Sequence, residues 1–102
     1  YPDIQIVICT PMYRFWMNDE GEFVEDTDTK VIANQKLTDF VENEKNVANE
    51  YNLLVIDNYN DLNINKTNYS EYFSATDGTH PNEKGRELIA EHIAKELYKK
   101  FK

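Results

Sequence analysis

The hydrophobic positions of this chain form two short runs. A nearly continuous apolar run, rich in β-branched residues, covers 4–9 and is closed by Pro11. A second run covers 53–56 and is followed by the turn-forming residues 57–60. Short, unbroken runs of this kind are typical of strands that are buried on both faces of a parallel sheet. The pattern therefore predicts parallel strands near 4–9 and 53–57.

Two further segments carry apolar residues at helical spacing. In 30–51 these are Ala33, Leu37, Phe40, Val41, Val47, Ala48 and Tyr51, and in 83–100 they are Leu88, Ile89, Ile93 and Leu97. We therefore expect helices near 30–51 and 83–100. A helical crossover of this length between two strands implies parallel pairing with a right-handed connection. The polar stretches at 12–29 and from Asp57 to His80 are predicted to be loops.

Composition narrows the class of protein. With 102 residues, of which 40% are apolar, the chain has the size of one small domain with a modest core. A net charge of -8 argues against a nucleic-acid partner, because phosphate binding needs a basic face. No apolar run is long enough to span a bilayer. The lone cysteine, Cys9, lies in the first apolar run, so we expect a buried thiol and no disulfide within the chain. None of these features separates a cytoplasmic from a secreted location.

The polar residues with the clearest chemistry lie just before the last predicted helix, in Asp77-Gly78-Thr79-His80-Pro81-Asn82. A carboxylate three residues ahead of an imidazole can hold that imidazole in the tautomer of a general base, which is half of a catalytic triad. Asp77 and His80 are therefore the candidate catalytic residues. The alternative is a helix-entry turn in which Asp77 caps backbone N–H groups and His80 only packs.

The residues around His80 also predict the local backbone. Pro81 disfavours the helical conformation at the residue before it, so His80 should lie on an extended turn. Gly78 allows a tight bend, and Asn82 suits the N-cap of the helix that follows.

The block at 77–82, followed by Gly85 and an apolar helix, resembles the C-terminal Asp-x-x-His block of SGNH (GDSL-type) hydrolases. The segment from Tyr1 to Pro11 is similar to the family's fourth strand and its prolyl turn, and 62–65 to the lead-in of its triad loop. The resemblance implies an α/β fold, the three-layer flavodoxin-like SGNH hydrolase fold. This chain would supply a C-terminal βαβα portion of it.

The resemblance also implies what precedes this chain in such an enzyme. The family's Gly-Asp-Ser nucleophile block, its oxyanion-hole Gly and its Gly-x-Asn-Asp block come earlier in the usual order, and none occurs here. Residues 1–102 are therefore expected to be a single partial domain, with the nucleophile on a missing N-terminal half. The only serines, Ser70 and Ser74, lie outside any Gly-Asp-Ser setting, so the chain alone is predicted to be inactive.

Candidate substrate-binding residues follow the first predicted strand, where open α/β sheets place their ligand crevice. They are Tyr13, Arg14 and Trp16, whose rings suit sugars or acyl chains and whose guanidinium suits a carboxylate or a sugar hydroxyl. The alternative is that Phe15 and Trp16 cover the edge of the core while Arg14 is solvated.

No cofactor or metal ion is expected. His92 lies about 18 Å along a helix from His80, too far for one metal or one proton relay. The acidic run 19–28 lacks the alternating pattern of a calcium-binding loop.

The sequence thus predicts serine-dependent ester hydrolysis by the full-length protein, as a lipase-like acyl esterase or a carbohydrate O-acetylesterase. The substrate would be a small-molecule or carbohydrate ester. The alternative from another class is a non-catalytic α/β interaction module that recruits a partner strand to the open edge of the first strand. Such an edge also favours oligomers.

Overall fold

Two short parallel strands lie at the centre of the computed structural model, which describes residues 3–74 and 78–101. Strand β1 (Val7–Cys9) pairs with β4 (Leu54–Ile56). In this register Val7 lies opposite Leu54 and Cys9 opposite Ile56. The pairing is parallel, as the length of the crossover predicts. The α/β class and the second predicted strand are confirmed.

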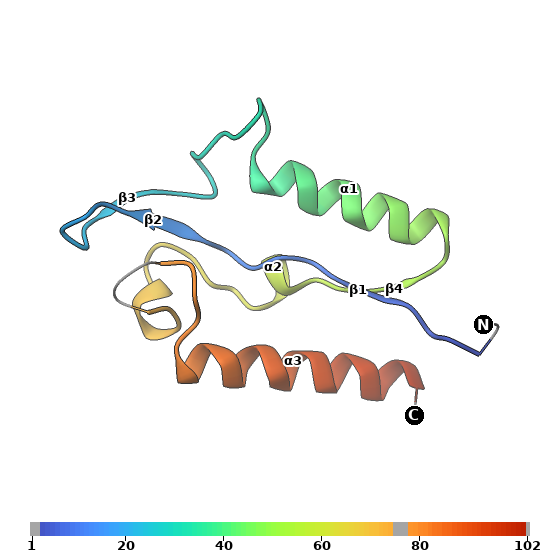
Figure 1. Ribbon diagram of the computed structural model, residues 1–102. Coiled ribbons are helices and arrows are strands. Elements are labelled where there is room, and N and C mark those ends of the chain that lie inside the picture. Colours follow the sequence, from blue (N-terminus) through green and yellow to red (C-terminus); the bar gives the residue numbers. More distant parts are fainter. Residues whose placement is uncertain (1–2, 75–77, 102) are drawn as a thin grey trace.

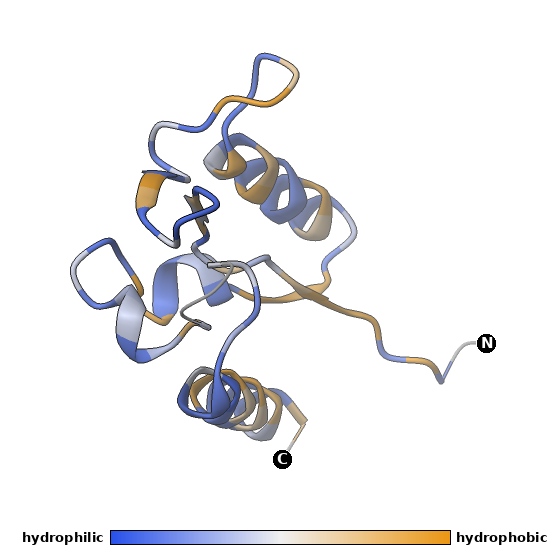
Figure 2. Ribbon diagram, turned by 60° about the vertical axis from the view of Figure 1, so that its left-hand side comes forward, coloured by the Kyte–Doolittle hydropathy of each residue, from blue (hydrophilic) through white to orange (hydrophobic). Residues whose placement is uncertain are grey.

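A long helix lies on each side of this sheet (Figure 1). These helices are α1 (Leu37–Glu50) and α3 (Glu83–Phe101), and both contact β4. The turned view shows the same three layers, with the apolar strands between the two helices (Figure 2). The helix predicted at 83–100 is confirmed. No helix among residues 3–74 and 78–101 combines the length and the apolar character that crossing a membrane requires.

Helix α1 begins later than predicted. The segment before it forms a tight turn, in which Ile32 and Gln35 pair as an antiparallel bridge and both Ala33 and Asn34 have positive φ. This left-handed backbone is incompatible with an α-helix, although Ala33 continues the apolar stripe. The helix starts where the backbone N–H of Lys36 donates to Asp39 Oδ2 at 2.9 Å, a contact that satisfies one polar group at the N-terminus.

Strand β1 is shorter and more exposed than the predicted strand at 4–9. Ile4 and Ile6 precede the strand and are 59% and 56% exposed, and Cys9 is also exposed. The prediction of a strand buried on both faces, with a buried thiol, was therefore wrong for this chain. The reason is that β1 pairs only with β4 among the described residues, so its other edge has no neighbouring strand to cover it.

The segment predicted as a loop at 12–29 contains an antiparallel hairpin. Its strands are β2 (Phe15–Met17) and β3 (Phe23–Asp26). Asn18 Oδ1 stabilises the turn by accepting hydrogen bonds from the backbone N–H groups of Glu20 and Glu22. The aromatic residues on either side of this Asn- and Gly-containing turn are the sequence signal for the hairpin.

The second predicted loop contains two short helical turns, α2 (Asn58–Asp61) and η1 (Tyr69–Glu71). Asp57 caps α2 by accepting the backbone N–H of Asn60 at 3.1 Å.

The buried apolar core connects this loop with the hairpin. Its buried residues are Tyr13, Phe15, Leu62, Ile64 and Phe73. Phe15 is 1% exposed and packs edge-on against Phe73, with ring centroids 5.4 Å apart. The core therefore lies beyond the carboxyl ends of β1 and β4, where it supports the connections that bear the candidate site (Figure 1).

Candidate active site

His80 lies on the connection between η1 and α3, and it is exposed. The backbone on both sides of the loop is held together, because the N–H of Ser74 donates to the carbonyl of His80 at 2.9 Å and Phe73 pairs with Pro81 as an isolated bridge. Since Phe73 is buried in the aromatic core, the bridge joins the loop of His80 to the packed interior. An exposed imidazole on an anchored backbone has the accessibility that a general base requires.

Gly78 packs this loop closely against strand β2. Its φ is +66°, and a Cβ added there would lie 2.6 Å from ring atoms of Phe15 and 2.7 Å from the Phe15 carbonyl oxygen. The N–H of Phe15 also donates to the Gly78 carbonyl at 3.5 Å. Glycine is therefore needed at this position for both its backbone conformation and its lack of a side chain, as the predicted tight bend required.

Asn82 begins helix α3 and ties it to the loop. Its Oδ1 accepts the N–H of Gly85 at 2.9 Å, which is the predicted N-cap interaction, and its Nδ2 donates to the Glu71 carbonyl at 2.9 Å. Gly85 itself packs so closely on the Tyr72 carbonyl that a Cβ there would collide with it. Helix α3 therefore starts at a fixed distance from the loop that carries His80.

Asp77, the predicted partner of His80, lies outside the described residues. The hydrogen bond from the His80 imidazole to the Asp77 carboxylate therefore stays a prediction from the sequence.

Alternation along 13–16, the segment that leads into β2, separates the predicted substrate-binding residues. Tyr13 and Phe15 face the core, where Tyr13 is 4% exposed and its hydroxyl donates to Asp26 Oδ2 at 2.6 Å. Burial and this hydrogen bond raise the pKa of Tyr13. The Tyr13 hydroxyl is thus engaged within the protein, while a role of Tyr13 in substrate binding stays a prediction from the sequence. Phe15 packs in the core, as predicted by the alternative in which Phe15 and Trp16 cover the core edge.

Arg14 and Trp16 lie on the opposite face of β2. Both side chains are half-buried, and the guanidinium carbon of Arg14 lies 4.5 Å from the centroid of the Trp16 ring. Stacking of this kind holds the planar guanidinium over the ring by cation–π attraction. The structure therefore brings two of the three candidate substrate-binding residues together.

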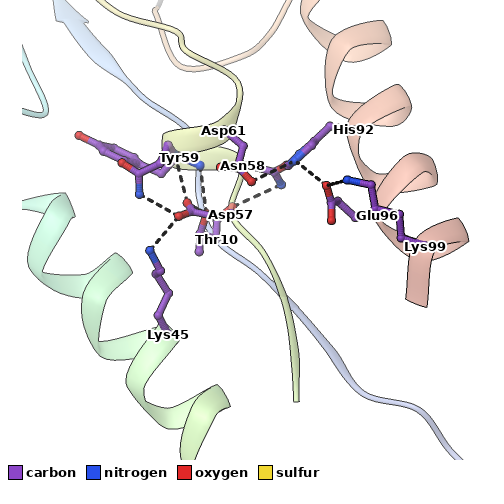
Figure 3. A network of polar contacts seen from close by, with 10 residues as sticks. Thr10, Lys45, Asp57, Asn58, Tyr59, Asp61, His92, Glu96 and Lys99 are labelled. Carbon is purple, nitrogen blue, oxygen red and sulfur yellow. Dashed lines mark hydrogen bonds and ion pairs between the residues drawn. The ribbon is translucent and has the colours of Figure 1, made fainter. Parts of the chain in front are cut away.

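A polar network at the ends of β1 and β4 connects the two long helices (Figure 3). Lys45 of α1 bonds the Asp57 carboxylate at 2.9 Å, and the Thr10 hydroxyl donates to the same carboxylate at 3.2 Å. Burial of Asp57 opposes ionisation, but hydrogen bonds from Asn60 and Lys45 lower its pKa to about 2.

The network continues to α3 through Asn58 and His92. Asn58 is 5% exposed, and its Oδ1 lies 2.8 Å from His92 Nδ1, while His92 Nε2 lies 3.4 Å from Asp61 Oδ2. Sequence reasoning assigned no role to Asp57 or Asn58 beyond turn formation. Their position directly after a buried strand is the signal that marks them as residues at the carboxyl edge of the sheet.

One comparison with known proteins identifies a family, and another finds a similar fold. The model of the GDSL-like lipase/acylhydrolase family matches residues 1–93. The crystal structure of a possible lipase from Chitinophaga pinensis DSM 2588 is similar to the chain, with a TM-score of 0.70 and 20% sequence identity. The similarity covers 96% of this chain and 54% of that one, so this chain spans about half the length of the solved protein. No curated protein matches the chain.

Proposed function

Because the chain belongs to the GDSL-like lipase/acylhydrolase family, we propose that it is the C-terminal portion of a serine-dependent ester hydrolase. His80 acts as the general base and Asp77 as the carboxylate that orients it. The observation that carries the proposal is an exposed imidazole on an anchored loop beyond the carboxyl ends of two parallel strands. Open α/β sheets bind their ligands at this edge.

The proposed reaction proceeds in two halves. A serine hydroxyl attacks the ester carbonyl carbon and transfers its proton to His80, which then returns that proton to the leaving alkoxide. Asp77 stabilises the imidazolium formed in between. Water releases the acyl group from the serine by the same proton transfers, so the products are an alcohol and a carboxylic acid.

The serine belongs, in this proposal, to polypeptide outside residues 1–102. Support comes from the apolar surface beside β1, which consists of Ile4, Ile6, Ile8, Phe40 and Val47 and is here named the β1 edge surface. Three of these residues, Ile8, Phe40 and Val47, line a concavity of about 330 Å³. An unpaired edge next to such a surface is suited to further strands and helices of the same domain. A preceding half of the domain would complete the sheet and bring the nucleophile.

The substrate is proposed to be a small-molecule or carbohydrate ester, including O-acetyl esters. The β1 edge surface also fits the second candidate function, a non-catalytic module that binds a partner strand there. The hydrolase and the non-catalytic module predict different polypeptide upstream of residue 1. A Gly-Asp-Ser strand turn in the upstream polypeptide is expected of the hydrolase, and its absence would favour the module.

The direct test is hydrolysis of p-nitrophenyl acetate by the full-length protein. His80→Ala should lower kcat by at least about 10³-fold, because general base catalysis and nucleophile activation are both lost. His92→Gln changes the other histidine of the chain and should leave turnover intact. Ser74→Ala should also remain active, since the nucleophile is proposed to lie elsewhere. Unchanged turnover in His80→Ala would remove His80 from the mechanism, and loss of activity in Ser74→Ala would contradict an external serine.

A further inference from the structure

Two adjoining concavities lead from the loop of His80 to the outer face of β2. The inner one has a volume of about 330 Å³, and its lining includes Met12, Phe73 and the two sequence neighbours of His80, Thr79 and Pro81. The outer one has a volume of about 110 Å³, and its lining includes Trp16 and Lys30. Arg14 and Leu37 line both. A ligand that reaches His80 can therefore extend along apolar side chains to the Trp16 ring.

The wall shared by the two concavities holds a cationic side chain with one unsatisfied donor. Arg14 Nε is buried and has no hydrogen-bond partner among residues 3–74 and 78–101. Its guanidinium has a ring on one face, 4.5 Å away, but no carboxylate of the described chain within ion-pair distance. Buried donors without partners are rare in folded proteins, and a charged one is costly, so this atom needs an acceptor that residues 3–74 and 78–101 do not supply.

The charged side chains around the Trp16 ring suit one negative group on a ligand. Lys30 Nζ lies 5.4 Å from the Trp16 ring centroid and forms an ion pair with Glu25 at 3.2 Å. Within residues 3–74 and 78–101, Lys30 is paired with Glu25 and Arg14 has no carboxylate partner, although the chain as a whole carries a net charge of -8. The small volume of the outer concavity also suits a planar carboxylate, which a guanidinium can bind by two parallel hydrogen bonds.

We propose that the outer concavity is a carboxylate subsite, with Arg14 as its principal ligand, and that the ester carries this carboxylate on an apolar segment beyond the reacting carbonyl. The apolar segment lies against Met12, Leu37 and Phe73. The assignment rests on the proposed ester hydrolysis at His80 for its reacting end, but the anion subsite is defined by Arg14, Trp16 and Lys30 alone. Acidic acyl esters and esters of hydroxy acids both have this form.

Binding can be measured apart from turnover. Monomethyl adipate and dimethyl adipate have the same length and differ by one negative charge, and the full-length His80→Ala protein allows both to be titrated by calorimetry without hydrolysis. The anionic monoester should bind about tenfold more tightly than the neutral diester, the size expected for one charge-assisted hydrogen-bonded contact. Equal affinities for the two compounds would overturn the proposal without any further variant.

Substitutions test whether the difference in affinity between the two esters arises at the subsite. Arg14→Gln should abolish the tenfold difference, Lys30→Gln should reduce it, and Arg14→Lys should restore part of it. Lys66→Gln, which removes an exposed charge elsewhere, is the matched control and should keep the full difference. A difference that survives Arg14→Gln in a folded protein would refute the role of Arg14.

Turnover then separates this inference from the proposed function. Wild-type protein should show a kcat/KM for the monoester about tenfold above that for the diester. Preferential binding of the monoester with no hydrolysis of any ester would contradict the esterase and support the carboxylate subsite. Hydrolysis of both esters with no preference in binding or rate would support the esterase and contradict the carboxylate subsite.

Discussion

Replacing Gly78 by alanine should test whether the loop of His80 depends on its contact with Phe15. The backbone at Gly78 has φ +66°, and the new Cβ would meet both the Phe15 ring and its carbonyl oxygen at less than 3 Å. The ring can turn, but the carbonyl belongs to strand β2 and cannot move without breaking the hairpin. The loop must therefore lift away from β2, and the bridge between Phe73 and Pro81 must shift with it.

Gly21 provides a matched control for the magnitude. Its φ is +77°, close to that of Gly78, but an added Cβ would meet no atom within 4 Å. Gly21→Ala should therefore lower the free energy of unfolding by about 1 kcal/mol, the cost of left-handed backbone for an L-residue. Gly78→Ala should lose a further 1–3 kcal/mol or so for overpacking. The entropy that alanine removes from the unfolded chain is the same in both variants and cancels in the comparison.

The assay combines urea denaturation of both variants with p-nitrophenyl acetate hydrolysis by the full-length protein. Displacement of the His80 backbone by about 1 Å can lower the rate by about a hundredfold, so Gly78→Ala should be far less active than Gly21→Ala. If both variants lose the same stability, or if Gly78→Ala hydrolyses the ester at the wild-type rate, the contact with Phe15 does not position His80.

Two further predictions concern the network and the open edge. The pKa of Asp57 falls from its ordinary value of 3.8 to about 2, so its stabilisation is full above pH 4 and is lost as the pH falls through 2, a change of about 2 kcal/mol. Acid denaturation should show this loss in wild-type protein and in Asp19→Asn but not in Asp57→Asn, and identical pH profiles would contradict the role of Asp57. Residues 1–102 expressed alone should self-associate through the β1 edge surface, as measured by light scattering. Ile6→Lys should weaken this association more than Val24→Lys, which changes a residue of similar exposure, and a well-folded wild-type monomer would count against an incomplete sheet.

Predictions from the sequence were most accurate where local chemistry controls the backbone. Pro81 and Asn82 mark the start of α3 whatever packs around them, because one restricts the residue before it and the other caps the helix. The parallel pairing of β1 and β4 likewise follows from two apolar runs and a crossover between them. The start of α3 depends on residues close together in the chain, whereas the pairing of β1 and β4 depends on the pattern of apolar runs along it.

Errors arose where packing decides the outcome. The hairpin of β2 and β3 was predicted as a loop, because its acidic turn is polar and the burial of Phe15 against Phe73 is a contact between residues far apart in sequence. Helix α1 was predicted to start too early, because apolar spacing alone does not reveal the left-handed backbone at Ala33 and Asn34. Cys9 was expected to be buried, because an apolar run does not say whether a second strand covers it.

The sequence by itself determined the family and the α/β class, and it singled out Asp77 and His80 as the catalytic candidates, since these depend on the pattern of apolar runs and on a motif. Only the tertiary structure decided which side chains share a surface. Because side chains alternate along 13–16, the segment that leads into β2, Tyr13 faces the core and Asp26, while Arg14 lies over Trp16 on the other face. That division depends on which face of the hairpin packs against the aromatic core, and the core is assembled from segments that the chain brings together only on folding.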